Sequence, residues 1–94
     1  MIAPDLLTRA DVRVSRDGWV TDKRHDSIVG MVTRDTNGAG RPIWRAHASD
    51  LGSFAFAREA AVLQVLAIHN MHEKARTYDL LARSSLRNTL AAPR

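Results

Sequence analysis

Hydrophobic residues recur at every second position in several short stretches of the first half of the chain, a period typical of β-strands. Turn signals separate these stretches, because Asp17-Gly18 and Asn37-Gly38 favour tight reversals of the backbone. The extended segments are VRVS (12–15), GWVTD (18–22), SIVGMVT (27–33) and IWRAHAS (43–49). The pattern predicts a small three- to four-stranded antiparallel sheet over about residues 12–49.

The segment at residues 43–49 is predicted to be the last strand, leading directly into a helix. Trp44, Ala46 and Ala48 fall on one face of this strand, and small alanines beside a tryptophan suit a face that a helix approaches closely. The opposite face carries Ile43, Arg45 and His47. We expect Arg45 and His47 to meet water or a ligand.

The second half of the chain has helical periodicity. Strong helix formers without Gly or Pro predict a helix over about residues 57–71. Between Ala60 and Ile68 only Gln64 is polar, so this helix needs cover on more than one side. A turn is expected near the polar stretch at residues 69–73, followed by a C-terminal helix over about 74–90. One stripe of the second helix is apolar: Ala75, Tyr78, Ala82, Leu86 and Leu90.

The surplus apolar surface of these helices has two possible partners. The first is a second copy of the chain, giving a homodimer through Tyr78, Ala82, Leu86 and Leu90. The second is an intramolecular helical hairpin in a monomer. The contact between sheet and helix is predicted to consist of Trp44, Ala46, Phe54, Ala60, Leu63 and Ala67.

Composition fits one α+β domain over residues 1–94. Hydrophobic residues make up 45% of the chain and charged residues 26%, as in soluble globular proteins. The chain has no cysteine, which speaks against a disulfide-stapled secreted module. Neither a signal peptide nor a membrane span is recognisable, so a cytoplasmic location is expected, in the host cell if the chain is phage-encoded.

The net charge of +4 lies entirely in residues 74–94, since the basic and acidic residues before them balance. Arg76, Arg83 and Arg87 form a stripe on the predicted C-terminal helix. Such a stripe lines a phosphate backbone in some proteins and is a solvated helix face in others.

No constellation of residues indicates catalysis, and no catalytic residue, metal ligand or cofactor is predicted. His69, His72 and Glu73 are neighbours on one helical face and could hold a divalent metal, but a polar helix end before a turn explains them better. Trp19 and Trp44 are both expected in the core, because the chain has only five aromatic residues.

Three short motifs carry a resemblance: Trp44-Arg45-Ala46, Leu51-Gly52-Ser53-Phe54 and Arg58-Glu59-Ala60-Ala61. Residues 18–69 resemble the DNA-binding domains built from a three-stranded sheet and a helix, of the ethylene-response-factor type and the phage integrase arm-binding type. With Gly18-Trp19-Val20, the chain is also similar to small proteins of actinobacterial phages and mobile elements. The resemblance implies that the sheet lies in the major groove. It also implies that Arg34, Arg45 and His47 contact DNA and that Trp44 is packed.

These observations lead to a non-enzymatic nucleic-acid-binding accessory or regulatory protein of phage or mobile-element origin, with double-stranded DNA as its partner. The alternative is a protein-interaction module that binds a host or defence protein, favoured by the neutral charge of the predicted sheet. A double-stranded-RNA-binding module is a weaker alternative, because the lysine-rich helix start of that class is missing.

Overall fold

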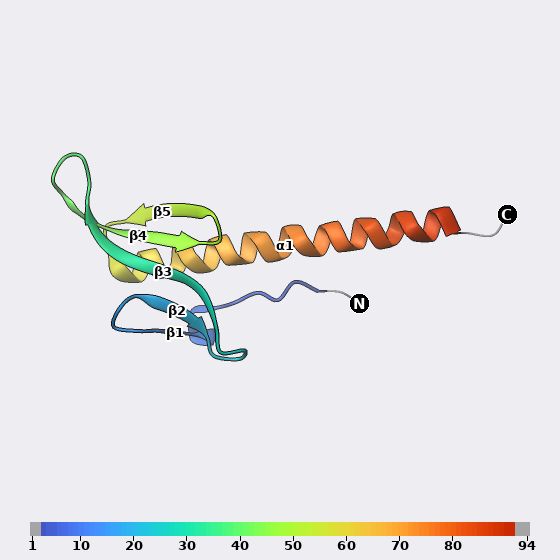
Figure 1. Ribbon diagram of the computed structural model, residues 1–94, viewed down its shortest axis with the longest axis horizontal. Coiled ribbons are helices and arrows are strands. Elements are labelled where there is room, and N and C mark those ends of the chain that lie inside the picture. Colours follow the sequence, from blue (N-terminus) through green and yellow to red (C-terminus); the bar gives the residue numbers. More distant parts are fainter. Residues whose placement is uncertain (1–2, 92–94) are drawn as a thin grey trace.

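The computed structural model describes residues 3–91, with side chains described as far as Ser84. A five-stranded sheet packs with one face against a long helix that extends far beyond it (Figure 1). A 3-10 turn, η1 (Arg9–Asp11), precedes the sheet. The elements that follow are β1 (Val12–Val14), β2 (Trp19–Asp22), β3 (Ser27–Thr36), β4 (Pro42–Ala48), β5 (Leu51–Ala55) and α1 (Arg58–Ala91).

The strands form an antiparallel meander in which each pairs with its neighbours in sequence, in the order β1-β2-β3-β4-β5. A bulge interrupts the pairing of β2 with β3, because Val20 faces Gly30 while Thr21 faces Ile28. Gly18, in the turn before β2, has a φ of 95° and lies so close to the carbonyl of Val32 that no side chain fits there. The predicted α+β class and antiparallel sheet are confirmed.

Alternation along the strands sends one set of side chains into the core beneath α1. Ala46 and Ala48 are buried there, and Trp44 packs against the same cluster, as the sequence predicted. The helix contributes Ala61, Val62, Val65 and Leu66. The remaining core residues are Leu7, Val12, Val20, Val32 and Ala55.

The prediction that β4 is the last strand is wrong. A two-residue turn at Ser49-Asp50 reverses the chain, and β5 pairs with β4 from Ala48↔Leu51 to Trp44↔Ala55. Ser49 adopts a φ of 55°, a conformation for which glycine or asparagine is the usual signal. The sequence of this turn therefore contains no glycine that would indicate a hairpin.

The predicted sheet–helix contact is correct for Trp44 and Ala46 of β4 and wrong for its other four residues. Phe54, Ala60, Leu63 and Ala67 are exposed. Phe54 follows strand alternation and points away from α1, since its neighbour Ala55 is the buried residue. The sequence did not indicate which side of the helix faces the sheet, because almost every position between Ala60 and Ile68 is apolar.

The two predicted helices are one continuous helix, so both the turn near residues 69–73 and the helical hairpin are wrong. Neither Gly nor Pro occurs within α1, and nothing in this stretch ends a helix. The polar residue Asn70 has a lateral partner instead. Its amide oxygen accepts from the Leu7 amide at 2.8 Å, and its amide nitrogen donates to the Leu7 carbonyl at 2.9 Å. Asn70 thus holds the N-terminal segment along α1 (Figure 1).

Candidate nucleic-acid interface

The face of the sheet turned away from α1, called the outer face here, is open. The strand register places three rows of side chains on it. Trp19, Met31 and His47 are directly paired across β2, β3 and β4, and the next row is Thr33, Arg45 and Phe54. The third row contains Asp35, which is exposed, and Ile43, which is buried. Sequence alternation correctly predicted that Arg45 and His47 are exposed together on this face.

Three aromatic side chains are exposed on or beside the outer face. Trp19 is 43% exposed, Phe54 51% and Phe56 54%. The two phenylalanine rings meet edge to face, with centroids 5.9 Å apart, and the guanidinium of Arg41 lies 4.1 Å from the centre of the Phe56 ring. Such rings next to cations are the groups that proteins use to contact bases and sugars.

Arg45 is held in place by the carboxylate of Asp35 on the neighbouring strand. The hydrogen bond from Arg45, with a further one from the Thr36 amide, keeps the pKa of Asp35 below its usual range. Both side chains are about half exposed, at 45% each. Arg45 is therefore oriented across the outer face while its remaining N–H groups stay accessible.

Arg34 does not share this surface. It pairs with Trp44 across β3 and β4, and directly paired residues lie on the same face, so Arg34 is on the helix side of the sheet. There it lines a hollow of about 300 Å³ together with Arg16 and Arg58 around Trp44. The three candidates implied by the resemblance are thus divided, with Arg45 and His47 on one face and Arg34 on the other.

The arginine stripe of the C-terminal half is engaged within its own helix. Arg76 lies 3.6 Å from Glu73 and Arg83 lies 3.1 Å from Asp79, each one turn away. Pairs at this spacing are typical of a solvated helix face. The side chain of Arg87 lies outside the described part of the structure.

The predicted dimer residues lie on the half of α1 that projects beyond the sheet. Tyr78 is 70% exposed, and Ala82 is exposed as well. The side chains of Leu86 and Leu90 lie outside the described residues.

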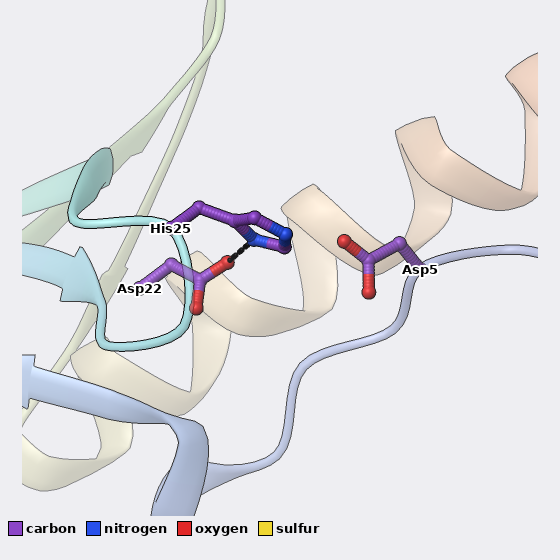
Figure 2. A group of neighbouring side chains, drawn as sticks. All are labelled: Asp5, Asp22 and His25. Atoms are coloured by element: carbon purple, nitrogen blue, oxygen red, sulfur yellow. Dashed lines mark hydrogen bonds and ion pairs between the residues drawn. The ribbon is translucent and has the colours of Figure 1, made fainter.

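A group of acidic and imidazole side chains gathers where the N-terminal segment meets the β2–β3 turn (Figure 2). Its members are Asp5, Asp22 and His25, and it is the one group within the described part of the chain close enough to share a metal ion. Arg24 donates to Asp5 at 2.9 Å and to Asp22 at 3.4 Å. One guanidinium therefore already bridges the two carboxylates and offsets one of their two negative charges. His69, His72 and Glu73 belong to no such group among the described residues.

Asp22 is the buried member of this group, and its hydrogen bonds stabilise its charged form. His25 donates to it at 2.9 Å, and the Arg24 amide donates at 2.9 Å. These bonds, led by that from His25, outweigh desolvation and lower the pKa of Asp22 from 3.8 to about 2.

We expect the free energy of unfolding to depend on Asp22 in acid. Because the folded pKa lies below the unfolded value, the stabilisation is fully present above about pH 4 and is lost as the pH falls through 2. Asp22→Asn should lower the free energy of unfolding near neutral pH by about 2 kcal/mol and flatten its acid dependence. Urea unfolding at a series of pH values measures both.

Asp26→Asn is the matched control, because Asp26 lies in the same turn with its side chain 86% exposed. Asparagine also tolerates the φ of 51° that Asp26 adopts. Equal acid dependence in Asp22→Asn and the wild type would show that the Asp22 hydrogen bonds do not carry this stability.

Sequence reasoning missed the aromatic part of the outer face. Trp19 was expected in the core, yet it is exposed because its neighbour Val20 takes the inward position of β2. Phe54 was expected in the contact between sheet and helix, and Phe56 was not assigned to any surface. Their period of two with Ala55 between them is a strand signal that could have placed both on one face.

Comparison with protein-family models, curated proteins and solved structures finds no match to this chain. Within the described residues, no helix combines the length and the apolar character that crossing a membrane requires.

Proposed function

We propose that this protein is a small non-enzymatic nucleic-acid-binding accessory or regulatory protein that contacts double-stranded DNA with its outer face. The observation that carries the proposal is the grouping of exposed aromatic and basic side chains on the side of the sheet that α1 leaves open. Arg45 and His47 lie beside Phe54 on adjacent strands, with Arg41 and Phe56 at the margin.

The chemistry of this face suits a nucleic acid better than a purely apolar partner. Guanidinium groups bind phosphates and the edge of guanine, and aromatic rings pack on sugars, bases and the thymine methyl group. The major groove admits a two-stranded ribbon, so the β4–β5 hairpin, which carries Arg45, His47 and Phe54, is the part that would enter it. The tail arginines are the competing surface; the two that are described pair with carboxylates of α1, as Arg45 pairs with Asp35, so variants of both surfaces are needed to distinguish them.

Fluorescence anisotropy with labelled duplex DNA, measured between about 50 and 200 mM salt, tests the proposal. Affinity should fall steeply as salt increases. Arg45→Ala and Phe54→Ala should each weaken binding by about tenfold, corresponding to the loss of one good contact. Both side chains are about half exposed, so neither substitution should unfold the protein.

Arg34→Ala is the matched control, because Arg34 is also an exposed arginine of the central hairpin but lies on the other face. Its affinity should equal that of the wild type, as should that of the double variant Arg83→Ala with Arg87→Ala. A loss confined to the tail variant would assign binding to α1. Absence of duplex binding even at low salt would refute the proposal and favour the protein-interaction alternative.

A further inference from the structure

The side of α1 turned away from the sheet carries a mostly apolar row of side chains, called the outer stripe here, in which Gln64 and Lys74 are the polar positions. At 100° per residue its members fall within about a third of the helix circumference, nearly opposite the buried residues Val62 and Val65. The largest members are well exposed: Leu63 50%, Met71 51%, Tyr78 70% and Leu81 42%. The apolar members of the outer stripe are Ala60, Leu63, Ala67, Met71, Ala75, Tyr78, Leu81 and Ala82.

No element described in the chain covers this stripe. The sheet contacts α1 through Ala61, Val62, Val65 and Leu66. The N-terminal segment lies on a different side, where Leu7 is bonded to Asn70 and Thr77 is buried. The second half of α1 projects beyond the sheet with no partner (Figure 1). Isolated helical segments of this length are marginal in water, so the projecting half needs a packing partner.

Two layers of the stripe are complementary when two helices run antiparallel. If Leu63 lies opposite Ala82 of the partner subunit, Ala67 lies opposite Tyr78 of the partner subunit. In both layers a large side chain meets a small one. In the same register Leu81 lies opposite Gln64 of the partner subunit. In the central layer, Met71 meets Lys74 of the partner subunit, whose aliphatic stem packs while its ammonium group reaches water. The axis of this pairing lies near the middle of α1, which spans Arg58–Ala91.

From these observations we infer that the protein is a homodimer with antiparallel α1 helices. The projecting half of each α1 packs on the outer stripe of the other subunit, along the half of that helix that is bound to its sheet. The length of the stripe matches this occupant, because the projecting half of one copy reaches along the sheet-bound half of the other. The four large side chains and the alanines between them bury roughly 1,000 Å² over both copies, the size at which specific interfaces begin. The inference is independent of nucleic-acid binding, since the outer face of the sheet lies on the opposite side of the molecule.

Light scattering at tens of micromolar protein tests the association. The wild type should have twice the chain mass of 10.4 kDa. Leu81→Glu should reduce the mass to that of a single chain, because it places a charge within the stripe. Leu80→Glu is the matched control, since Leu80 is the adjacent leucine, is 38% exposed and lies outside the stripe. A wild type of single-chain mass, or equal dissociation by both variants, would overturn the inference.

Cysteine cross-linking tests the orientation, and the chain has no cysteine of its own. A mixture of Leu63→Cys and Ala82→Cys proteins should be joined by a short bismaleimide into a heterodimer. Leu63→Cys alone should not be joined, because its two copies lie about 28 Å apart along the helix pair at 1.5 Å per residue. Efficient joining of Leu63→Cys to itself indicates parallel helices and would contradict the arrangement.

Discussion

Replacing Gly30 by alanine is expected to lower the free energy of unfolding by about 3 kcal/mol or more. A Cβ atom at this position would lie 2.3 Å from the carbonyl oxygen of His47 and 2.6 Å from a methyl group of Val65. The first of these atoms belongs to the backbone of the neighbouring strand and the second to the core side of α1. Neither can move without separating β3 from β4 or the helix from the sheet.

Gly52→Ala provides the control, because Gly52 is also a strand glycine of the same sheet. Its nearest atoms to an added Cβ are the Ala46 carbonyl oxygen at 3.7 Å and the His47 ring at 3.9 Å, which are ordinary contacts. Its free energy of unfolding should change by no more than about 0.5 kcal/mol. Urea unfolding at one fixed protein concentration measures both variants, since dimer formation would make stability depend on concentration. Equal stability of the two variants would mean that α1 does not approach β3 this closely.

The sequence predicts a strand well when a recognisable turn signal stands next to it. β1 and β2 are separated by Asp17-Gly18, and β3 and β4 by a turn that contains two glycines, Gly38 and Gly40. A glycine inside a strand pattern indicates a bulge or a close approach, and Gly30 has both, because it adjoins the β2–β3 bulge and packs under Val65. In these strands the alternating hydrophobic period and the turn residues indicate the same structure, so the local sequence is sufficient to predict them.

The elements that sequence reasoning missed depend on interactions that local patterns do not contain. The β4–β5 turn uses Ser49 in a left-handed conformation, so no glycine marked the hairpin. The polar stretch around Asn70 looked like a helix end because its partner, the Leu7 backbone, is distant in sequence. When a helix is apolar on most sides, its sequence does not indicate which positions face the core. Only the fold distinguishes the buried Val62 from the exposed Leu63.

In the candidate interface, too, local sequence patterns predicted some residues correctly, while the others depend on interactions between strands. Alternation within one strand correctly placed Arg45 and His47 together on the open face. It could not relate Arg34 to Arg45, because that relation depends on the register between β3 and β4. The aromatic residues were missed for a related reason: Phe54 and Phe56 join the surface only once β5 is recognised as a strand.

The two tryptophans are expected to respond to substitution in opposite ways. Trp44→Ala should lower the free energy of unfolding by about 3 kcal/mol, the lower end for a buried aromatic residue, because Trp44 packs between the sheet and α1 and is only partly covered. The guanidinium of Arg58, 5.8 Å from the ring centre, loses its stacking partner in this variant. Trp19→Ala should change stability by less than about 1 kcal/mol, since Trp19 is 43% exposed on the outer face.

For duplex binding the order is expected to reverse. Trp19→Ala removes a ring from the row that contains Met31 and His47, and should weaken DNA binding by about tenfold while the protein stays folded. Trp44→Ala, measured where the remaining folded fraction is known, should bind with wild-type affinity per folded molecule, because Trp44 faces α1. Urea unfolding and anisotropy on the same two preparations separate the effects. A stability loss in Trp19→Ala as large as that in Trp44→Ala would place Trp19 in the core, and the outer face would lose one of its three rings.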